Sequence, residues 1–540
     1  MRETVSTDAG SGARRSRWLS RARTLLPTPA EAFCAAASAL LLSCAFPDFD
    51  VWPLAWVALV PLLFRLARRP RPVQSLLSGW LAGTLFFYTS CYWLTFPMIH
   101  YAGIPAPLSY LLLLVPAAAG GFFPALFALA LARLCGRWGT AALLLAPALW
   151  VACEWARLGA IGQLWNAVGY SQAFEPALIQ SARFGGVYAV SFLVLACNAA
   201  LAYALLKRSL RGALASLAAV VCVALVVYGA TLTDAPGVEH KSSAVVIAVQ
   251  PNVIPDFNRS ESEYEALRRR HFELSDEGLR GLGAPVDERP RVVVWPESPM
   301  NFTLERDRRF REELTRYVGE RRVSLLFNSL EPAAGGGGYN AAVLVNEKGL
   351  PAAQYDKIRL MPFGEYVPLP RWLPGAGMLG GVVGDFTPGE HYTLIPLSSS
   401  EGSPRAGAFI CLESAYPDIT RRLTLEGADV LIEMTNDAYQ GNTSVLRQHL
   451  SNAVFRAVET GRTLLRVTNT GVSARIDERG RVFEETGRFV EAVRTWPVAR
   501  SDGSRTFYVE HGDVFAAACS LLSLACIALT FRRKRLEPNF

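Results

Sequence analysis

Apolar runs long enough to cross a lipid bilayer place the strongest constraint on this chain of 540 residues. A crossing helix needs about 20 predominantly apolar residues, with about 17 as a lower limit. Runs near or above that length occupy 29–46, 51–66, 76–98, 107–132, 141–158, 184–206, 212–233 and 513–531. Hydrophobic residues make up 51% of the chain, as expected for a membrane protein. We therefore predict eight transmembrane helices.

The basic residues predict how these helices are oriented. Lysine and arginine are enriched in cytoplasmic loops, and eight crossings put all the basic clusters flanking the runs on one side: 14–23, 65–71, 133–137, 207–211 and 532–535. Both termini then lie in the cytoplasm, and the segment before the last helix lies outside. A signal sequence cleaved near Cys44 is the alternative, but its removal would break this parity. The clusters explain most of the formal charge of +7, so we expect no nucleic-acid binding.

The chain is expected to divide into four parts: a basic cytoplasmic tail (1–28), seven transmembrane helices (29–235), an extracytoplasmic domain (236–508), and the last helix with a second basic tail (509–540). The domain at 236–508 alternates short β-like segments with charged helical ones. This alternation is typical of a layered α/β domain. Strands are predicted at 243–250, 291–295, 323–328, 339–345, 391–396, 406–411, 429–434, 463–468 and 471–476, and helices at about 261–282, 305–321 and 444–460.

Cys411 is the only cysteine of the predicted extracytoplasmic domain, whereas the other nine lie in the predicted membrane part. It ends the strand-like segment 406–411 and has no partner in its domain for a disulfide. A lone thiol at the end of a strand is a candidate nucleophile. The alternative is a small buried hydrophobic residue.

Other residues of this domain could assist a nucleophile. Glu297 follows the strand-like segment 291–295 and is a candidate general base, or a surface turn residue. Lys357 is one of five lysines in an arginine-rich chain; its ammonium suits an oxyanion, although a solvated surface lysine is the alternative. Glu365 and Glu413 are expected to position or tune the lysine and the nucleophile, or to form structural ion pairs. The histidines are scattered and no glycine-rich phosphate loop precedes a helix, so we expect no metal and no cofactor.

The order Glu297, Lys357, Cys411 resembles the triad of the nitrilase superfamily. Longer motifs resemble the apolipoprotein N-acyltransferase family, at 295–298, 356–368, 410–413, 435–439, 448–449, 456–459 and 466–471. That family places a nitrilase-like domain before the last of eight membrane helices, and the resemblance implies an αββα sandwich at 236–508. The chain departs from the family pattern at Leu412, at 439–441 and around Phe257, which bears on the substrate pocket.

The resemblance implies acyl transfer in two half-reactions at a bacterial inner membrane. Glu297 would take the proton of Cys411, which would attack a phospholipid ester while Lys357 stabilises the oxyanion. The resulting thioester would acylate the amine of a diacylglyceryl apolipoprotein. The expected enzyme is a monomer with its catalytic domain on the periplasmic side.

The substrate-binding residues are expected to be Asn340, Tyr439 and Trp165. Trp165 lies in the loop 162–172, whose aromatic residues could instead form an interfacial belt. The apolar segment 372–384 is expected to be either a glycine-hinged lid or a packed loop.

The sequence leaves two other classes of function open. A membrane-tethered nitrilase-like amidohydrolase would use water as the acceptor, but eight helices exceed what a tether requires. A non-catalytic lipid-binding or transport protein would carry ionisable residues within its membrane segments. Glu154 and Arg157 are the obvious residues of that kind.

Overall fold

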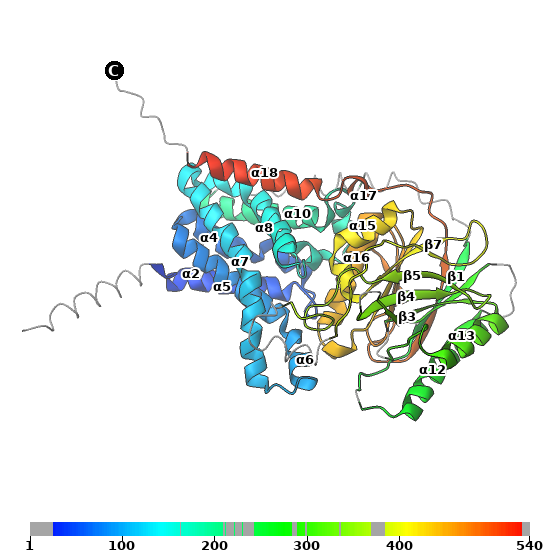
Figure 1. The fold of residues 1–540 in the computed structure, drawn as a ribbon. Helices are drawn as coiled ribbons and strands as arrows, with labels where there is room; N and C mark the ends of the chain where they lie inside the picture. Colours follow the sequence, from blue (N-terminus) through cyan, green and yellow to red (C-terminus); the bar gives the residue numbers. More distant parts are fainter. Residues whose placement is uncertain are drawn as a thin grey trace, which may run out of the picture.

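The computed structural model describes residues 25–208 and 242–531, except 163, 257, 283–288, 298–299, 334–335 and 369–383, and the single residues 211, 221 and 229. An all-helical part and an α/β part lie side by side (Figure 1). The basic tail before residue 25, the basic cluster 532–535 and Phe257 lie outside the described residues. So do the predicted helix 212–233 and the predicted lid 372–384, apart from residues 221, 229 and 384.

Each of the seven predicted apolar runs that the structure describes contains a helix. The helices of this part are α2 (Pro29–Cys44), α3 (Ala55–Ala58), α4 (Val60–Arg68), α5 (Pro72–Ser90), α6 (Thr95–His100), α7 (Ala106–Trp138), α8 (Ala146–Ile161), α9 (Pro176–Ile179), α10 (Ala182–Lys207) and α18 (Val514–Leu529). By length and composition, the described residues contain two stretches able to span a membrane, Ala106–Ile161 and Ala182–Lys207; α2 and α18 are shorter apolar helices. Eight crossings therefore remain a prediction.

The α/β part contains two six-stranded sheets, in the orders β12-β1-β2-β3-β4-β5 and β11-β10-β9-β8-β7-β6. The strands of the first are β1 (Ala244–Gln250), β2 (Arg291–Val294), β3 (Ser324–Pro332), β4 (Gly338–Val345), β5 (Pro351–Asp356) and β12 (Ala492–Val498). Those of the second are β6 (Ile395–Pro396), β7 (Arg405–Ile410), β8 (Val430–Thr435), β9 (Leu464–Thr468), β10 (Ala474–Ile476) and β11 (Val482–Phe483). The predicted strand 391–396 is reduced to two residues, and β5, β11 and β12 were not predicted.

Helices cover the outer faces of both sheets, which confirms the layered α/β prediction. Helices α12 (Glu261–Gly281) and α13 (Arg308–Arg321) bury Phe272 and Phe310 against the first sheet. Helices α15 (Pro417–Leu425) and α16 (Val445–Thr460) pack on the second sheet. Apolar side chains of both sheets, such as those of Val292 and Ile432, share one core between the layers. The strands are apolar on both faces because each sheet is covered on both sides.

The strand directions bring the candidate residues to one edge. Strands β1, β2 and β3 are parallel, as are β7, β8 and β9. Strand β4 is antiparallel to both β3 and β5, so β5 runs in the same direction as β3. Glu297 follows β2, Lys357 follows β5 and Cys411 follows β7, so each lies at the carboxyl end of its strand.

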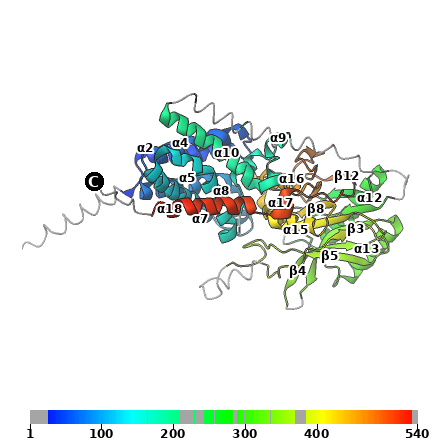
Figure 2. The same cartoon turned by 90° about the horizontal axis from the view of Figure 1, so that it is seen from above.

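Helix α16 also joins the α/β part to the helical part. The side-chain oxygen of Gln448 accepts hydrogen bonds from the indole N–H groups of Trp93 (3.1 Å) and Trp165 (2.9 Å). Arg447 forms an ion pair with Asp50 at 2.7 Å. Helix α17 (Phe507–His511) leads from the α/β part into α18, which runs along the helical part (Figure 2). The two parts therefore share a polar, specific contact surface.

Candidate active site

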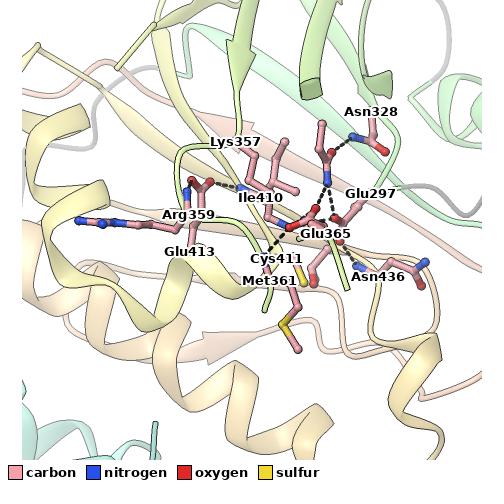
Figure 3. A network of polar contacts seen from close by, with 12 residues as sticks. Glu297, Asn328, Lys357, Arg359, Met361, Glu365, Ile410, Cys411, Glu413 and Asn436 are labelled. Atoms are coloured by element: carbon pink, nitrogen blue, oxygen red, sulfur yellow. Dashed lines mark hydrogen bonds and ion pairs between the residues drawn. The ribbon is translucent and has the colours of Figure 1, made fainter. Parts of the chain in front are cut away.

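Glu297, Lys357 and Glu365 form a charged network at the common edge of the sheets. Nζ of Lys357 lies 2.9 Å from Oε1 of Glu365 and 3.3 Å from Oε1 of Glu297. The amide of Asn340 donates to the same two oxygens, at 2.6 Å to Glu365 and 2.9 Å to Glu297. Oε2 of Glu297 accepts from the backbone N–H of Asn436 at 3.1 Å. Both carboxylates are thus held at defined positions around one ammonium (Figure 3).

Lys357 is a buried cation, because only 1% of its side chain is exposed. Burial by itself lowers its pKa, but the carboxylates of Glu297 and Glu365 raise the pKa well above its ordinary value. An ammonium carries three hydrogens, and within the described residues these carboxylates accept two of them. The third can face an oxyanion. The surface-lysine alternative is therefore wrong.

Cys411 is held in a strained turn directly after β7. Its φ of 53° lies in the left-handed region, which costs a residue other than glycine about 1–3 kcal/mol. It begins the short 3-10 helix η5 (Cys411–Ala415), and its side chain points toward Glu297 and Glu365 (Figure 3). Burial and the charge of Glu297 raise the pKa of the thiol well above its ordinary value, although Lys357 lowers it. The thiol is therefore neutral at rest and requires a base when it attacks.

Glu413 ties the nucleophile turn to the lysine segment. Its carboxylate is fully buried and accepts hydrogen bonds from the backbone N–H groups of Ile358 (2.7 Å), Arg359 (3.0 Å) and Ile410 (2.7 Å). The hydroxyl of Tyr355 also donates to it at 2.9 Å. Burial raises the pKa of Glu413 to about 7, although these backbone contacts lower it. Glu413 thus connects the peptide groups beside the candidate nucleophile and the candidate oxyanion partner.

The three expected substrate-binding residues lie in different settings. Asn340 is inside the charged network, where its amide hydrogens hold both carboxylates. Tyr439 lies in the short helix η6 (Ala438–Gln440), edge-on to Tyr101 of the helical part with ring centroids 5.6 Å apart. Burial and the nearby Glu297 raise the pKa of Tyr439 to about 12. Trp165 is buried against α16. Substrate binding by these residues stays a prediction.

Several polar residues of the site have roles that were not predicted from the sequence. Asn328 donates to the side-chain oxygen of Asn340 at 2.6 Å, and Asn436 contacts Glu297 through its backbone. His449 contacts the carbonyl of Cys411. The sequence signal that could have identified Asn328 as a site residue was an asparagine near the end of an apolar strand-like segment. The described residues include no group of three or more His, Cys, Asp or Glu side chains placed to hold a metal ion.

A Glu, Lys and Cys constellation at one edge of a two-sheet α/β sandwich defines a domain of the carbon–nitrogen hydrolase class. Residues 282–506 match the carbon–nitrogen hydrolase family, and residues 38–200 match the apolipoprotein N-acyltransferase N-terminal domain. The chain belongs to the apolipoprotein N-acyltransferase family.

Relatives in that family are similar over nearly their full length. The chain is 32% identical over 517 residues to the apolipoprotein N-acyltransferase of Geobacter metallireducens, covering 93% of this chain and 95% of that one. It is 33% identical over 521 residues to that of Azotobacter vinelandii, covering 94% and 96%. Among solved structures, an amidase of the nitrilase superfamily from Nesterenkonia AN1 aligns with 52% of this chain and 98% of its own, at 17% identity and a TM-score of 0.36.

Proposed function

We propose that this chain moves a fatty acyl chain from a membrane phospholipid, through a thioester on Cys411, to the N-terminal amine of diacylglyceryl-cysteine apolipoproteins. The observation that carries the proposal is the meeting of Glu297, Lys357 and Cys411 at one edge of the two-sheet sandwich, in a chain of this family. Family membership favours this function over a tethered amidohydrolase and over a lipid-binding or transport protein.

In the first half-reaction, Glu297 takes the proton of the Cys411 thiol as the sulfur attacks the carbonyl carbon of a phospholipid ester. A bond forms between sulfur and carbon, and the carbonyl oxygen becomes an oxyanion that faces the ammonium of Lys357. The carbon–oxygen bond of the ester then breaks. The leaving oxygen takes the proton back from Glu297, which releases a lysophospholipid and leaves an acyl thioester.

In the second half-reaction, the amine of the diacylglyceryl-cysteine attacks the thioester carbonyl. The same ammonium faces the second oxyanion, and Glu297 takes a proton from the attacking nitrogen. The carbon–sulfur bond breaks, and the sulfur of Cys411 recovers its proton. The products are an amide on the apolipoprotein and the free enzyme.

The neighbouring residues hold the base, the lysine and the nucleophile in position. Glu365 and Asn340 hold the base and the lysine through contacts of 2.6–2.9 Å. Glu413 holds the nucleophile turn against the segment that carries Lys357. Groups fixed in advance spend less energy on reorganisation as charge develops in the transition state.

The membrane part explains how both substrates reach the site. Both are lipid-anchored, so a catalytic domain held over the bilayer raises their effective concentration. We propose eight crossings, the four-part division at residues 28, 235 and 508, and a catalytic domain on the periplasmic side of the inner membrane. The proposed enzyme is a monomer, requires no cofactor and binds no nucleic acid.

Intact-mass spectrometry of the full-length protein in detergent tests the thioester directly. After incubation with a diacyl glycerophospholipid, the parent protein should gain one acyl mass and lose it when a diacylglyceryl-cysteine peptide is added. Cys411→Ala should gain none, whereas Cys526→Ala, at a half-buried free cysteine of α18, should behave like the parent. An unacylated parent or an acylated Cys411→Ala protein would exclude the scheme. Acyl loss to water alone, with none transferred to the peptide, would establish a hydrolase that uses water as the acceptor instead.

A further inference from the structure

A buried cluster of four charged side chains lies next to the backbone of the nucleophile. Arg466 of β9 contacts Glu433 at 2.5 Å and Asp437 at 2.7 Å. His449 of α16 contacts the same two carboxylates, at 3.1 Å from Glu433 and 2.7 Å from Asp437. None of these side chains is more than 3% exposed. The proposed reaction makes no use of this cluster.

The partners of His449 determine its protonation. Nδ1 faces Oδ1 of Asp437, and Nε2 faces both the carbonyl of Cys411 at 3.0 Å and Oε1 of Glu433. Carbonyl and carboxylate oxygens only accept hydrogen bonds, so both ring nitrogens must carry hydrogen. His449 is therefore an imidazolium. Together with Arg466 it balances the charges of the two carboxylates.

The carbonyl of Cys411 accepts a hydrogen bond from the buried imidazolium of His449. This peptide group follows the residue with the left-handed φ of 53°. On the other side of the nucleophile, the N–H of Ile410 is held by Glu413 at 2.7 Å. The peptide group that follows Cys411 and the peptide group that precedes Ile410 are thus both held by buried side chains. Rotation of either would move the thiol relative to Glu297 and Lys357.

We propose that His449 is a positioning residue for the nucleophile, because its bond to the Cys411 carbonyl holds the left-handed turn that aims the thiol at the acyl carbon. This inference rests on the proposed function, since it assumes that Cys411 carries the acyl group. It also gives Trp165 a role other than substrate binding. The rings of Trp165 and His449 pack with their centroids 5.6 Å apart. The indole N–H of Trp165 donates a hydrogen bond to Gln448, the residue before His449 in α16.

The test compares His449→Phe, which removes both donors, with His449→Gln, which can still donate to the Cys411 carbonyl. The matched control is His271→Gln, because His271 is the other buried histidine of the described α/β part and packs in a separate core away from η5. For each full-length protein we would measure the rate of thioester formation per folded molecule, kcat, KM for phospholipid and the unfolding temperature.

His449→Phe should form the thioester at least about 10-fold more slowly, the effect of losing one charge-assisted hydrogen bond. KM should change less than about twofold, and His449→Gln should recover part of the rate. His271→Gln should lower the unfolding temperature but keep its rate per folded molecule. A His449→Phe protein that is merely less stable, with a rate within about twofold of the parent, would overturn the inference. An unacylated parent protein would instead overturn the proposed function, so the two failures are distinguishable.

Discussion

Oε1 of Glu459 accepts a hydrogen bond of 2.8 Å from the backbone N–H of Val187, at the break in helix α10. The break falls at Gly185 and Gly186, and a side chain at Gly186 would be strained by its φ of +63° and would crowd Tyr508. A carboxylate at the N-terminus of the second half of α10 is favourable because that end is partially positive. The α/β part thus caps a helix of the helical part.

The same carboxylate leads back to the nucleophile turn. Oε2 of Glu459 pairs with Arg456 at 2.6 Å, and Arg456 donates to the carbonyl of Ser414 at 3.0 Å. Ser414 belongs to η5, the short helix that begins with Cys411. A chain of buried polar contacts therefore connects helix α10 to the candidate nucleophile.

Arg456→Met should destabilise the protein by about 3–5 kcal/mol, because it leaves the buried charge of Glu459 unpaired. The double variant Arg456→Met/Glu459→Gln should lose less than Arg456→Met alone. Thermal unfolding in detergent measures both. Arg308→Met is the control, since Arg308 is 83% exposed and solvent screens its ion pair with Glu312, so its loss should leave the stability almost unchanged. If the double variant lost as much stability as the two single substitutions added together, Arg456 and Glu459 would not be a coupled pair.

Lys357→Met should slow thioester formation by roughly 10²–10³-fold, the usual effect of removing an oxyanion partner. Stopped reactions followed by intact-mass spectrometry give the rate. Lys348→Met in the 346–349 turn is the control and should keep the parent rate. Near-parent acylation by Lys357→Met would exclude the oxyanion role.

Glu413→Gln should cost about 1–3 kcal/mol of stability and also lower activity. A glutamine keeps one acceptor oxygen, so its NH2 group would face either the N–H of Ile410 or those of Ile358 and Arg359, leaving donors unsatisfied. The unfolding temperature and the rate of thioester formation measure the two effects. The exposed Glu401→Gln serves as the control. Unchanged stability would show that these donors find other partners.

The stability contributed by His449 should depend on pH. Burial and Arg466 lower its pKa, but Asp437 and Glu433 raise it further, to about 9. Because this pKa lies above the ordinary value of about 6.5, the contribution is complete below pH 6.5 and is lost as the pH rises through 9. The full contribution is on the order of 3 kcal/mol. The unfolding temperature of the parent should therefore approach that of His449→Gln across this range.

The other charged groups around His449 should not mask this titration. Burial raises the pKa values of Glu433 and Asp437, but Arg466 and His449 lower both below their ordinary values. The pKa values of Arg466 and the Cys411 thiol are raised, the latter well above its ordinary value. A constant difference in unfolding temperature between pH 6.5 and 9 would contradict an imidazolium at His449.

Much of the fold could be predicted from the sequence because its signals are local. An apolar run of spanning length or a buried strand is recognisable from its own residues. The positions of Glu297 and Cys411 at strand ends were predicted in this way, and helices were found in every predicted apolar run that the structure describes. Strand β5 was missed because four of its six residues are exposed or half-exposed alanine, proline and glutamine, so it lacks an apolar pattern.

The sequence by itself determined the division into apolar and mixed α/β parts, since run length suffices for it. It also determined the candidate triad, through the resemblance of its motifs to a known family. Only the tertiary structure decided which side chains surround the triad. Sequence motifs contain His449 and Arg456, and Asn340 was an expected substrate-binding residue. Their contacts join strands and helices far apart in the chain. Such contacts depend on strand pairing and helix packing, which bring distant residues within hydrogen-bond distance. The fold also makes the helical part a neighbour of the nucleophile turn, because Trp165 packs on His449, which contacts the carbonyl of Cys411.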